Sequence, residues 1–117
     1  MNIEQFRDYC LSKKSVTEDA PFGEDWVTYR IGGKIFALLY LRDPVFKVNL
    51  KHHPEENIEL RERYPEIEPG YHMNKRHWNT VNFEGNLRLD FLKELIDHSY
   101  QAVLENLSKT KRRKLGL

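Results

Sequence analysis

Hydrophobic side chains near the start of the chain recur at the spacing of an amphipathic helix. The apolar positions of this first segment are Ile3, Phe6 and Cys10. Asn2 is followed three residues later by Gln5, the spacing of a capping box at a helix N-terminus. The pattern predicts a short helix over residues 2–13, with Cys10 as a buried structural thiol.

A longer apolar stripe lies near the end of the chain. It consists of Leu92, Leu95, Ile96, Tyr100, Val103, Leu104 and Leu107, at the 3.6-residue period of a helix. We therefore predict a long helix that Asp90 caps and that continues to about Leu107. The Lys and Arg residues after Ser108 suit the negative C-terminal end of this helix, before the chain frays into a tail.

Three strand patterns fill the region between these helices. Trp26–Ile31 alternates between two faces, and Gly32-Gly33 supplies two residues that tolerate positive φ in a tight hairpin turn. Lys34–Leu41 is almost continuously apolar, as expected of a central strand. Residues 46–51 alternate again, after a turn at Arg42-Asp43-Pro44.

The remaining segments predict a peripheral helix, a further strand and two loops. Proline suits the first turn of a helix over Pro54–Tyr64, which has few apolar residues. Trp78–Phe83 has a strand pattern, and Glu84-Gly85-Asn86 predicts a turn that could lead into a short return strand. The stretches 15–25 and 65–69 are expected to be loops.

These elements predict an α+β sandwich, in which an antiparallel sheet carries the N- and C-terminal helices and an additional peripheral helix. Because both terminal helices are amphipathic, both should cover the same sheet face and leave the other face open. A chain of 117 residues is long enough for one domain with its own core. We assign residues 1–108 to this domain and residues 109–117 to a basic tail.

The open face of the sheet is one candidate ligand surface. Its expected outward side chains are Trp26, Thr28, Arg30, Lys47, Asn49 and Lys51. The central strand adds either Phe36, Leu38 and Tyr40 or the alternate set. Aromatic rings among basic and amide groups resemble the stacking platforms that bind single-stranded nucleic acid. The commoner interpretation is a solvated sheet face with ordinary surface charge.

Charge is unevenly distributed along the chain. The net charge is +1, from 19 basic and 18 acidic residues, but the last nine residues hold five of the basic ones. Without these five, 14 basic residues remain against 18 acidic ones, so the body has a charge of about −4. Attraction to nucleic acid needs clustered cations at the contact, so composition alone does not favour generic DNA binding by the body.

The chain shows no targeting or membrane signal. No apolar run approaches the roughly 18 residues of a membrane span. The first residues, Met1–Gln5, have neither a basic start nor an apolar signal core. We therefore expect a cytoplasmic protein, and a monomer.

The most unusual stretch is Gly70–Val81, which holds two His, two Asn, Lys, Arg, Tyr and Trp. Aromatic bodies beside polar groups suit either a buried hydrogen-bonded corner or a site that clamps a ligand. We expect Tyr71, Trp78 and Val81 to form a corner of the core. The polar residues between them remain candidates for ligand contacts.

Five histidines raise the question of a metal site. They are His52, His53, His72, His77 and His98, with Glu66 and Glu68 as nearby carboxylates in the sequence. Helical zinc ligands prefer i, i+4 spacing, and structural zinc sites commonly use several cysteines, whereas this chain has only Cys10. Their spacing specifies no metal site, and we expect neither a metal nor a cofactor.

The chain also lacks common enzyme signatures. It contains no G-x-S-x-G element, no P-loop and no glycine-rich dinucleotide turn. Cys10 lies on a predicted core stripe, a poor position for a nucleophile. We expect no enzymatic activity.

The run Pro69–Val81, and above all its Asn-Lys-x-His-Trp-Asn-Thr-Val core, resembles the MmcQ/YjbR family. The likeness covers nearly the whole chain, through Pro21-Phe22-Gly23, Lys34–Leu41, Phe46-Lys47-Val48 and Leu95–Tyr100. The resemblance implies a CyaY-like, or frataxin-like, α+β fold. It also implies DNA binding, the label commonly given to the family.

We therefore predict a non-enzymatic DNA-binding protein that contacts phosphates through the 70–81 motif and the tail. The candidate contacts are Asn74, Lys75, Arg76, His77, Asn79, Arg30, Lys47, Lys111, Arg112 and Arg113. The tail has a second interpretation, as solubilising sequence or a helix-end charge complement. The alternative function is a small-molecule or protein-interaction module in which the 70–81 motif forms a polar pocket.

Overall fold

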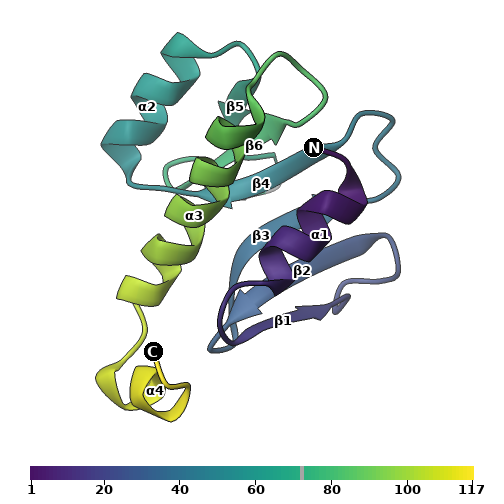
Figure 1. Ribbon diagram of the computed structural model, residues 1–117. Helices are drawn as coiled ribbons and strands as arrows, with labels where there is room; N and C mark the ends of the chain where they lie inside the picture. The colour runs from purple at the N-terminus through teal and green to yellow at the C-terminus, as the bar shows by residue number, and fades with distance from the viewer. Residues whose placement is uncertain (72) are drawn as a thin grey trace.

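The computed structural model describes residues 1–71 and 73–117. Six strands form one antiparallel sheet in the order β1-β2-β3-β4-β6-β5 (Figure 1). The strands are β1 (Val16–Asp19), β2 (Trp26–Ile31), β3 (Lys34–Tyr40), β4 (Lys47–Lys51), β5 (Ile67–Pro69) and β6 (Trp78–Asn82). The helices are α1 (Ile3–Leu11), α2 (Pro54–Arg63), α3 (Leu89–Glu105) and α4 (Lys109–Lys114). The predicted α+β class is confirmed.

Helices α1 and α3 lie across the same face of the sheet, as expected from their apolar stripes (Figure 1). Phe6 of α1 is fully buried and meets three aromatic rings edge-on. Its ring centroid lies 5.5 Å from Tyr29, 5.7 Å from Phe46 and 5.6 Å from Phe83. Such edge-to-face contacts are the preferred geometry of buried aromatic pairs. The core therefore sits between the sheet and these two helices.

A bulge in β3 decides which side chains reach the open face. Tyr29 pairs with Ala37, whereas Arg30 pairs with Ile35, so Phe36 is an extra residue in the ladder. Phe36 turns into the core and packs edge-on against Tyr100 of α3 at 5.5 Å. Leu38 and Tyr40 stay on the open face. The expected set of Phe36, Leu38 and Tyr40 is thus split between the two faces.

Several local predictions are confirmed. The capping box of Asn2 and Gln5 is present, with both of its hydrogen bonds. Gly32 and Gly33 have φ values of +58° and +82°, as the tight hairpin requires. The predicted helix Pro54–Tyr64 corresponds to α2, and the strand Trp78–Phe83 corresponds to β6.

Other boundaries differ from the prediction. Asp90 does not cap α3, because the helix begins at Leu89 and Arg88 occupies the N-cap position without a capping side chain. Asp90 lies in the first turn, where its negative charge suits the helix dipole. Among the described residues, the segment after Glu84 forms no return strand and leads directly into α3.

The two segments expected to be loops each contain an edge strand, β1 and β5. β1 has only one apolar residue, Val16, and its position at the sheet edge requires no alternation of apolar side chains. β5 ends at Pro69, a residue that edge strands tolerate because one side of the ladder is unpaired. Sequence periodicity therefore gave no signal for either strand.

The segment expected to fray instead forms helix α4, which Ser108 caps. Leu115 and Leu117 after this helix are partly buried against the core. The hydroxyl of Ser15 donates to the Leu115 carbonyl at 3.1 Å, and the Lys14 ammonium donates to the Gly116 carbonyl. These contacts hold the basic segment against the sheet. None of the described helices is long and apolar enough to cross a membrane.

Candidate nucleic-acid interface

Helix α2 holds the loop that carries the 70–81 motif. Asn57 of α2 is fully buried, and its side-chain amide donates to the carbonyls of His52 and Arg76 at 3.2 and 3.1 Å. The same residue accepts a hydrogen bond from the Asn79 side chain at 2.9 Å. Every polar atom of the Asn57 amide therefore ties α2 to the motif loop or to the end of β4.

Arg61, one helical turn after Asn57, completes this attachment. Its guanidinium donates to Asn79 Oδ1 at 2.6 Å, to the Trp78 carbonyl at 3.2 Å and to the Lys75 carbonyl. A planar guanidinium can serve several acceptors at fixed angles, which a lysine ammonium does less well. The two α2 residues, spaced i, i+4 on one helix face, thus fix the path of the motif loop.

This attachment changes the role of Asn79. Its side chain is only 3% exposed and is shared between Arg61 and Asn57. The expected ligand contact through Asn79 is therefore replaced by an internal hydrogen bond. Periodicity could not predict this, because the burial of Asn79 depends on how α2 docks.

The tip of the motif loop is held by hydrogen bonds between residues of the loop itself. The Asn74 side chain accepts the Arg76 N–H at 2.9 Å, and the Asn74 carbonyl accepts the Trp78 N–H at 3.0 Å. The Lys75 ammonium donates to the Gly70 carbonyl at 3.1 Å. Arg76 is exposed and His77 is half-buried. Asn74 and Lys75 are exposed as well, but their side chains already have these partners within the loop, which leaves Arg76 as the main candidate.

The expected core corner forms only in part. Val81 is buried and Trp78 is half-buried, but Tyr71 is 67% exposed. Trp78 pairs with Lys51 across β4 and β6 and so lies on the open face of the sheet. Tyr71 is attached through its backbone, because its N–H donates to the Thr80 hydroxyl at 2.9 Å. His72, which was weighed as a metal ligand, lies outside the described residues.

The sheet topology brings most of the candidate cations to one end of the strands. The β2–β3 hairpin, the end of β4 and the start of β6 all meet at this end, because each neighbouring pair is antiparallel. Helix α4 also lies here, since Leu115 reaches the hairpin at Gly32. We define the basic edge as Lys34, Lys51, Lys75, Arg76, Lys109, Lys111, Arg112, Arg113 and Lys114.

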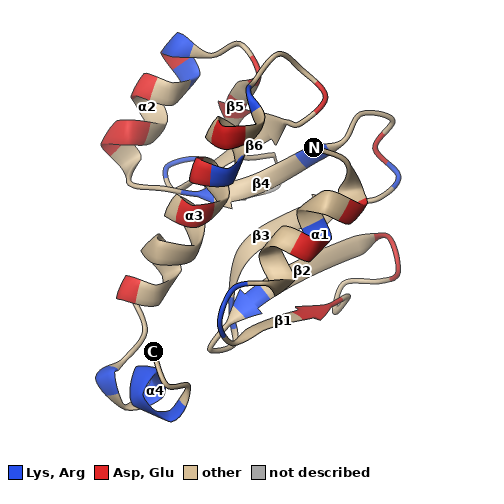
Figure 2. Cartoon of the chain, in the orientation of Figure 1, with Lys and Arg blue, Asp and Glu red and all other residues tan. Residues whose placement is uncertain are grey.

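The opposite ends of the strands carry the acidic loops. Their carboxylates belong to Glu24, Asp25, Asp43, Glu66 and Glu84. Figure 2 shows α4 mostly blue, whereas the loops at the other ends of the strands carry red segments. The body is net acidic, yet its fold separates the charges. Acidic residues also occur at this end: Glu55 and Glu56 begin α2 after β4, and Glu105 lies in the last turn of α3 before α4.

Two of the candidate cations lie away from the basic edge or are already paired. Arg30 lies on the open face, where it pairs with Asp19 at 3.3 Å and donates to the Gly33 carbonyl at 2.9 Å. Lys47 begins β4 at the acidic end of the sheet. The structure therefore groups Lys75, Arg76 and the α4 residues, and separates Lys47 from them.

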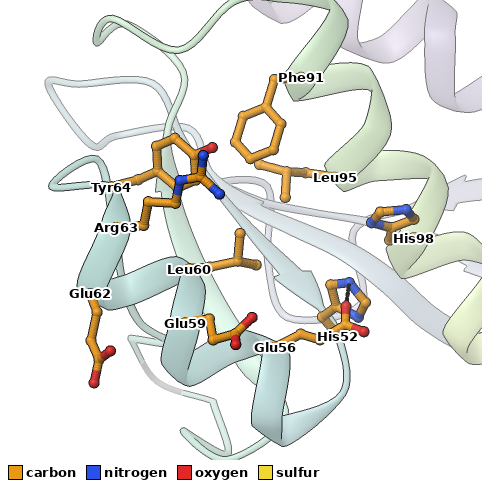
Figure 3. Close-up of a pocket in the computed structure, with 10 residues that line it drawn as sticks. All are labelled: His52, Glu56, Glu59, Leu60, Glu62, Arg63, Tyr64, Phe91, Leu95 and His98. Atoms are coloured by element: carbon orange, nitrogen blue, oxygen red, sulfur yellow. Dashed lines mark ion pairs between the residues drawn. The ribbon is translucent and has the colours of Figure 1, made fainter.

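A groove of about 580 Å³ separates α2 from α3 (Figure 3). Its walls include Leu60, Tyr64, Phe91 and Leu95, and its floor holds two histidine rings. The rings of His52 and His98 lie 4.8 Å apart, and His52 Nε2 lies 2.5 Å from a Glu56 carboxylate oxygen. Burial lowers the pKa of His52, although Glu56 acts in the opposite direction.

The histidines of this groove do not form a metal centre. Within residues 1–71 and 73–117, no three His, Cys, Asp or Glu side chains are placed to hold a metal ion together. The single cysteine, Cys10, is fully buried as predicted, and burial raises the pKa of its thiol to about 12. It therefore stays protonated near neutral pH, the unreactive form of a cysteine.

Sequence reasoning did not name Lys34 and Lys51 of the basic edge as contacts, and it missed the role of Asn57 and Arg61. The sequence does place Asn57 and Arg61 four apart on a helix with few apolar residues. A polar pair at this spacing on one face was the available signal.

Comparisons with known proteins agree with this fold and motif. A family model described as YjbR matches residues 11–102. The chain is 39% identical to the uncharacterized protein YbdF of Escherichia coli O157:H7 over 89 residues, which cover 76% of this chain and 73% of that protein. It is 30% identical to the uncharacterized protein YjbR of Escherichia coli K12 over 117 residues, 98% of each chain.

Solved structures extend the likeness to three dimensions. The crystal structure of Deinococcus radiodurans protein DR2400 has 32% sequence identity and a TM-score of 0.93, over 99% of this chain and 88% of the other. A crystal structure from Pseudomonas syringae has 34% identity and a TM-score of 0.76, over 87% and 98% of the two chains. The protein therefore belongs to the YjbR family, as its 70–81 motif predicted.

Proposed function

We propose that this protein is a non-enzymatic DNA-binding domain whose basic edge contacts the phosphate backbone. The observation that carries the proposal is the gathering of Lys34, Lys51, Lys75, Arg76 and helix α4 at one end of the strands. Clustered cations neutralise phosphates and release counterions, which is the main source of sequence-independent affinity for DNA. In this proposal the protein acts as a cytoplasmic monomer.

The ordered position of α4 supports a specific role for its charges. A disordered tail would attract phosphates without any fixed geometry. Here Ser108 caps the helix, and the Ser15 hydroxyl and Lys14 ammonium hold the residues after it. The cations of α4 therefore have a fixed position beside the β2–β3 hairpin.

The 70–81 motif contributes less than the family label suggests. The Asn79 side chain accepts a hydrogen bond from Arg61 of α2. Within the loop, the Asn74 side chain accepts the Arg76 N–H and the Lys75 ammonium donates to the Gly70 carbonyl. These internal bonds also weigh against the alternative in which Asn74, Lys75 and Asn79 form a polar pocket, because their side chains already have partners. Within this loop, the proposal assigns the main phosphate contact to Arg76.

A salt titration of DNA affinity tests the proposal. Removal of the chain after Ser108 is a poor test, because Leu115 and Leu117 pack against the core. Lys111→Gln combined with Arg113→Gln keeps the fold and removes two exposed charges. Each lost phosphate contact should reduce the slope of log affinity against log salt by about 0.9 for duplex DNA.

Arg63→Gln combined with Arg88→Gln is the matched control, since both residues are exposed and neither belongs to the basic edge. This control should leave the slope unchanged. Equal losses of DNA affinity in the two double variants would mean that binding depends on the net charge of the protein and not on the position of the cations. Absence of binding by the natural protein at low salt would refute the proposal.

A further inference from the structure

The open face of the sheet carries a hollow whose lining includes no residue of the basic edge. It has a volume of about 470 Å³, within the range of small-molecule sites. Its lining crosses four strands, with Trp26 on β2, Tyr40 on β3, Lys47 and Asn49 on β4, and Thr80 on β6. Residues 42–44 form one wall, and Tyr71 forms another.

Aromatic rings dominate the rim of this hollow. Trp26 and Tyr40 are cross-strand partners, and their ring centroids lie 4.6 Å apart with an interplanar angle of 32°. Tyr40 is 38% exposed and Tyr71 is 67% exposed, values that leave large apolar surface in contact with water. Planar ligands gain free energy by covering such surface.

The floor of the hollow is polar and rigid. The Thr80 hydroxyl donates to Asn49 Oδ1 at 2.6 Å and accepts the Tyr71 N–H at 2.9 Å. The Asn49 amide in turn donates to the Leu38 carbonyl at 3.2 Å. This chain of bonds fixes the backbone of Tyr71 relative to the sheet and so places its ring at the side of the hollow.

The charged residues of the hollow leave one position, at Lys47, that can bind an anion. Arg42 is neutralised by Asp25 at 2.9 Å. In the part of the chain that the structure describes, no carboxylate forms an ion pair with Lys47. Lys47 lines the hollow together with Tyr40, and its ammonium can meet a phosphate. Asp43 on the same wall can accept hydrogen bonds from a sugar hydroxyl or an amino group.

The geometry points to a nucleotide site in this hollow, with the base against Tyr40 and Tyr71 and the phosphate at Lys47. The nucleotide is either a free mononucleotide or one unit of a single strand. In the second case the inference rests on the proposed function and extends it from the basic edge to the open face. No residue of the basic edge takes part in the site.

Titration with adenosine monophosphate and with a single-stranded oligothymidylate tests the inference, followed by amide chemical shifts. Binding of either probe should shift the amides of Tyr40, Lys47 and Tyr71. Tyr40→Ala should weaken the binding about 5-fold to 150-fold, the effect of removing one stacking ring. Lys47→Gln should weaken the binding of adenosine monophosphate but not of adenosine.

Phe22→Ala is the control, because Phe22 is 62% exposed but does not line the hollow. It should leave both affinities unchanged, and thermal unfolding should show that all variants remain folded. Binding of the oligothymidylate alone, with the same sensitivity to Tyr40→Ala, identifies the nucleotide as part of a strand. Absence of binding by both probes, or affinities unaffected by Tyr40→Ala and Lys47→Gln, would overturn the inference.

The two proposals fail separately. Loss of the salt-dependent duplex binding at the basic edge would remove the proposed function and leave a free-nucleotide site intact. Loss of the Tyr40 and Lys47 effects would remove the nucleotide site and leave the basic edge unaffected.

Discussion

The side-chain amide of Asn79 donates to the side-chain oxygen of Asn57 at 2.9 Å, and both residues are buried. One residue belongs to the motif that identifies the family, and the other belongs to the peripheral helix α2. The motif is therefore, first of all, the place where α2 attaches to the sheet. This attachment leaves Arg76 on the surface, beside the other cations of the basic edge.

Replacing Asn57 by Ala should be strongly destabilising. The change removes three hydrogen bonds and leaves the carbonyls of His52 and Arg76 and the Asn79 amide without their partner. Unsatisfied buried groups cost about 1–3 kcal/mol each before relaxation, so we expect a loss of about 3 kcal/mol in the free energy of unfolding. Urea denaturation measures this change in the free energy of unfolding. Ile58→Ala, at an exposed neighbouring position, should cost far less.

Arg61→Lys should loosen the motif loop while the charge is kept. A lysine ammonium cannot reach the Asn79 side chain and the carbonyls of Lys75 and Trp78 with the geometry of a guanidinium. We expect a loss of about 1–2 kcal/mol and faster hydrogen exchange at the Trp78 N–H. Arg63→Lys, on the exposed side of the same helix, serves as control. An unchanged rate of hydrogen exchange at the Trp78 N–H in Arg61→Lys would show that hydrogen bonds within the loop are sufficient to order it without Arg61.

Gly70 should not tolerate a side chain. A Cβ atom at this position would lie 2.7 Å from the Trp78 Cβ and 2.8 Å from the Trp78 carbonyl oxygen. Gly70→Ala should therefore cost about 1–3 kcal/mol through overpacking, measured by chemical denaturation. At Gly85 the three atoms nearest to an added Cβ all belong to the side chain of Glu66, which can move away, whereas at Gly70 two of the three are backbone atoms. A loss as large in Gly85→Ala as in Gly70→Ala would contradict this explanation.

Stability should depend on pH through His52. Burial holds the pKa of His52 below its unfolded value, so the unfolded chain binds more protons. The contribution of His52 is fully present above the unfolded pKa of about 6.5 and is lost as the pH falls through that value towards the folded pKa. The urea midpoint of the natural protein should fall between about pH 7 and pH 5.

The His52→Gln variant should show a flatter pH dependence over the same interval. His53→Gln, at the exposed neighbouring position, should keep the slope of the natural protein. Equal slopes in all three proteins would mean that His52 does not couple protonation to folding.

The sequence predicted the elements whose side chains pack on the core and missed those held by backbone pairing alone. Helices α1 and α3 and the central strands have periodic apolar residues, and their arrangement follows from that pattern. The edge strands β1 and β5 are mostly exposed and lack such a pattern. Their pairing is settled by the neighbouring strand.

The sequence named some residues of the basic edge as contacts, among them Arg76 and Arg113, but it named neither Lys34 nor Lys51 and did not predict the surface. Basic residues at positions 34, 51, 76 and 113 are far apart in the sequence, and only the strand order places them at one end of the sheet. In the same way, the burial of Asn79 follows from the docking of Asn57 and Arg61. Candidate contacts could therefore be chosen by residue type, but only the fold shows which of these side chains are accessible and which are used in internal hydrogen bonds.

The amide chemical shifts of the labelled protein on titration with short duplex DNA at low salt test the central claim most directly. We expect the largest changes at the basic edge, in Lys34, Lys51, Arg76 and residues 109–114, and small changes at Asn79. The acidic loops around Asp25 and Glu84 should not respond, and added salt should reverse the shifts. Shifts confined to those acidic loops, or no shifts at low salt, would contradict the account.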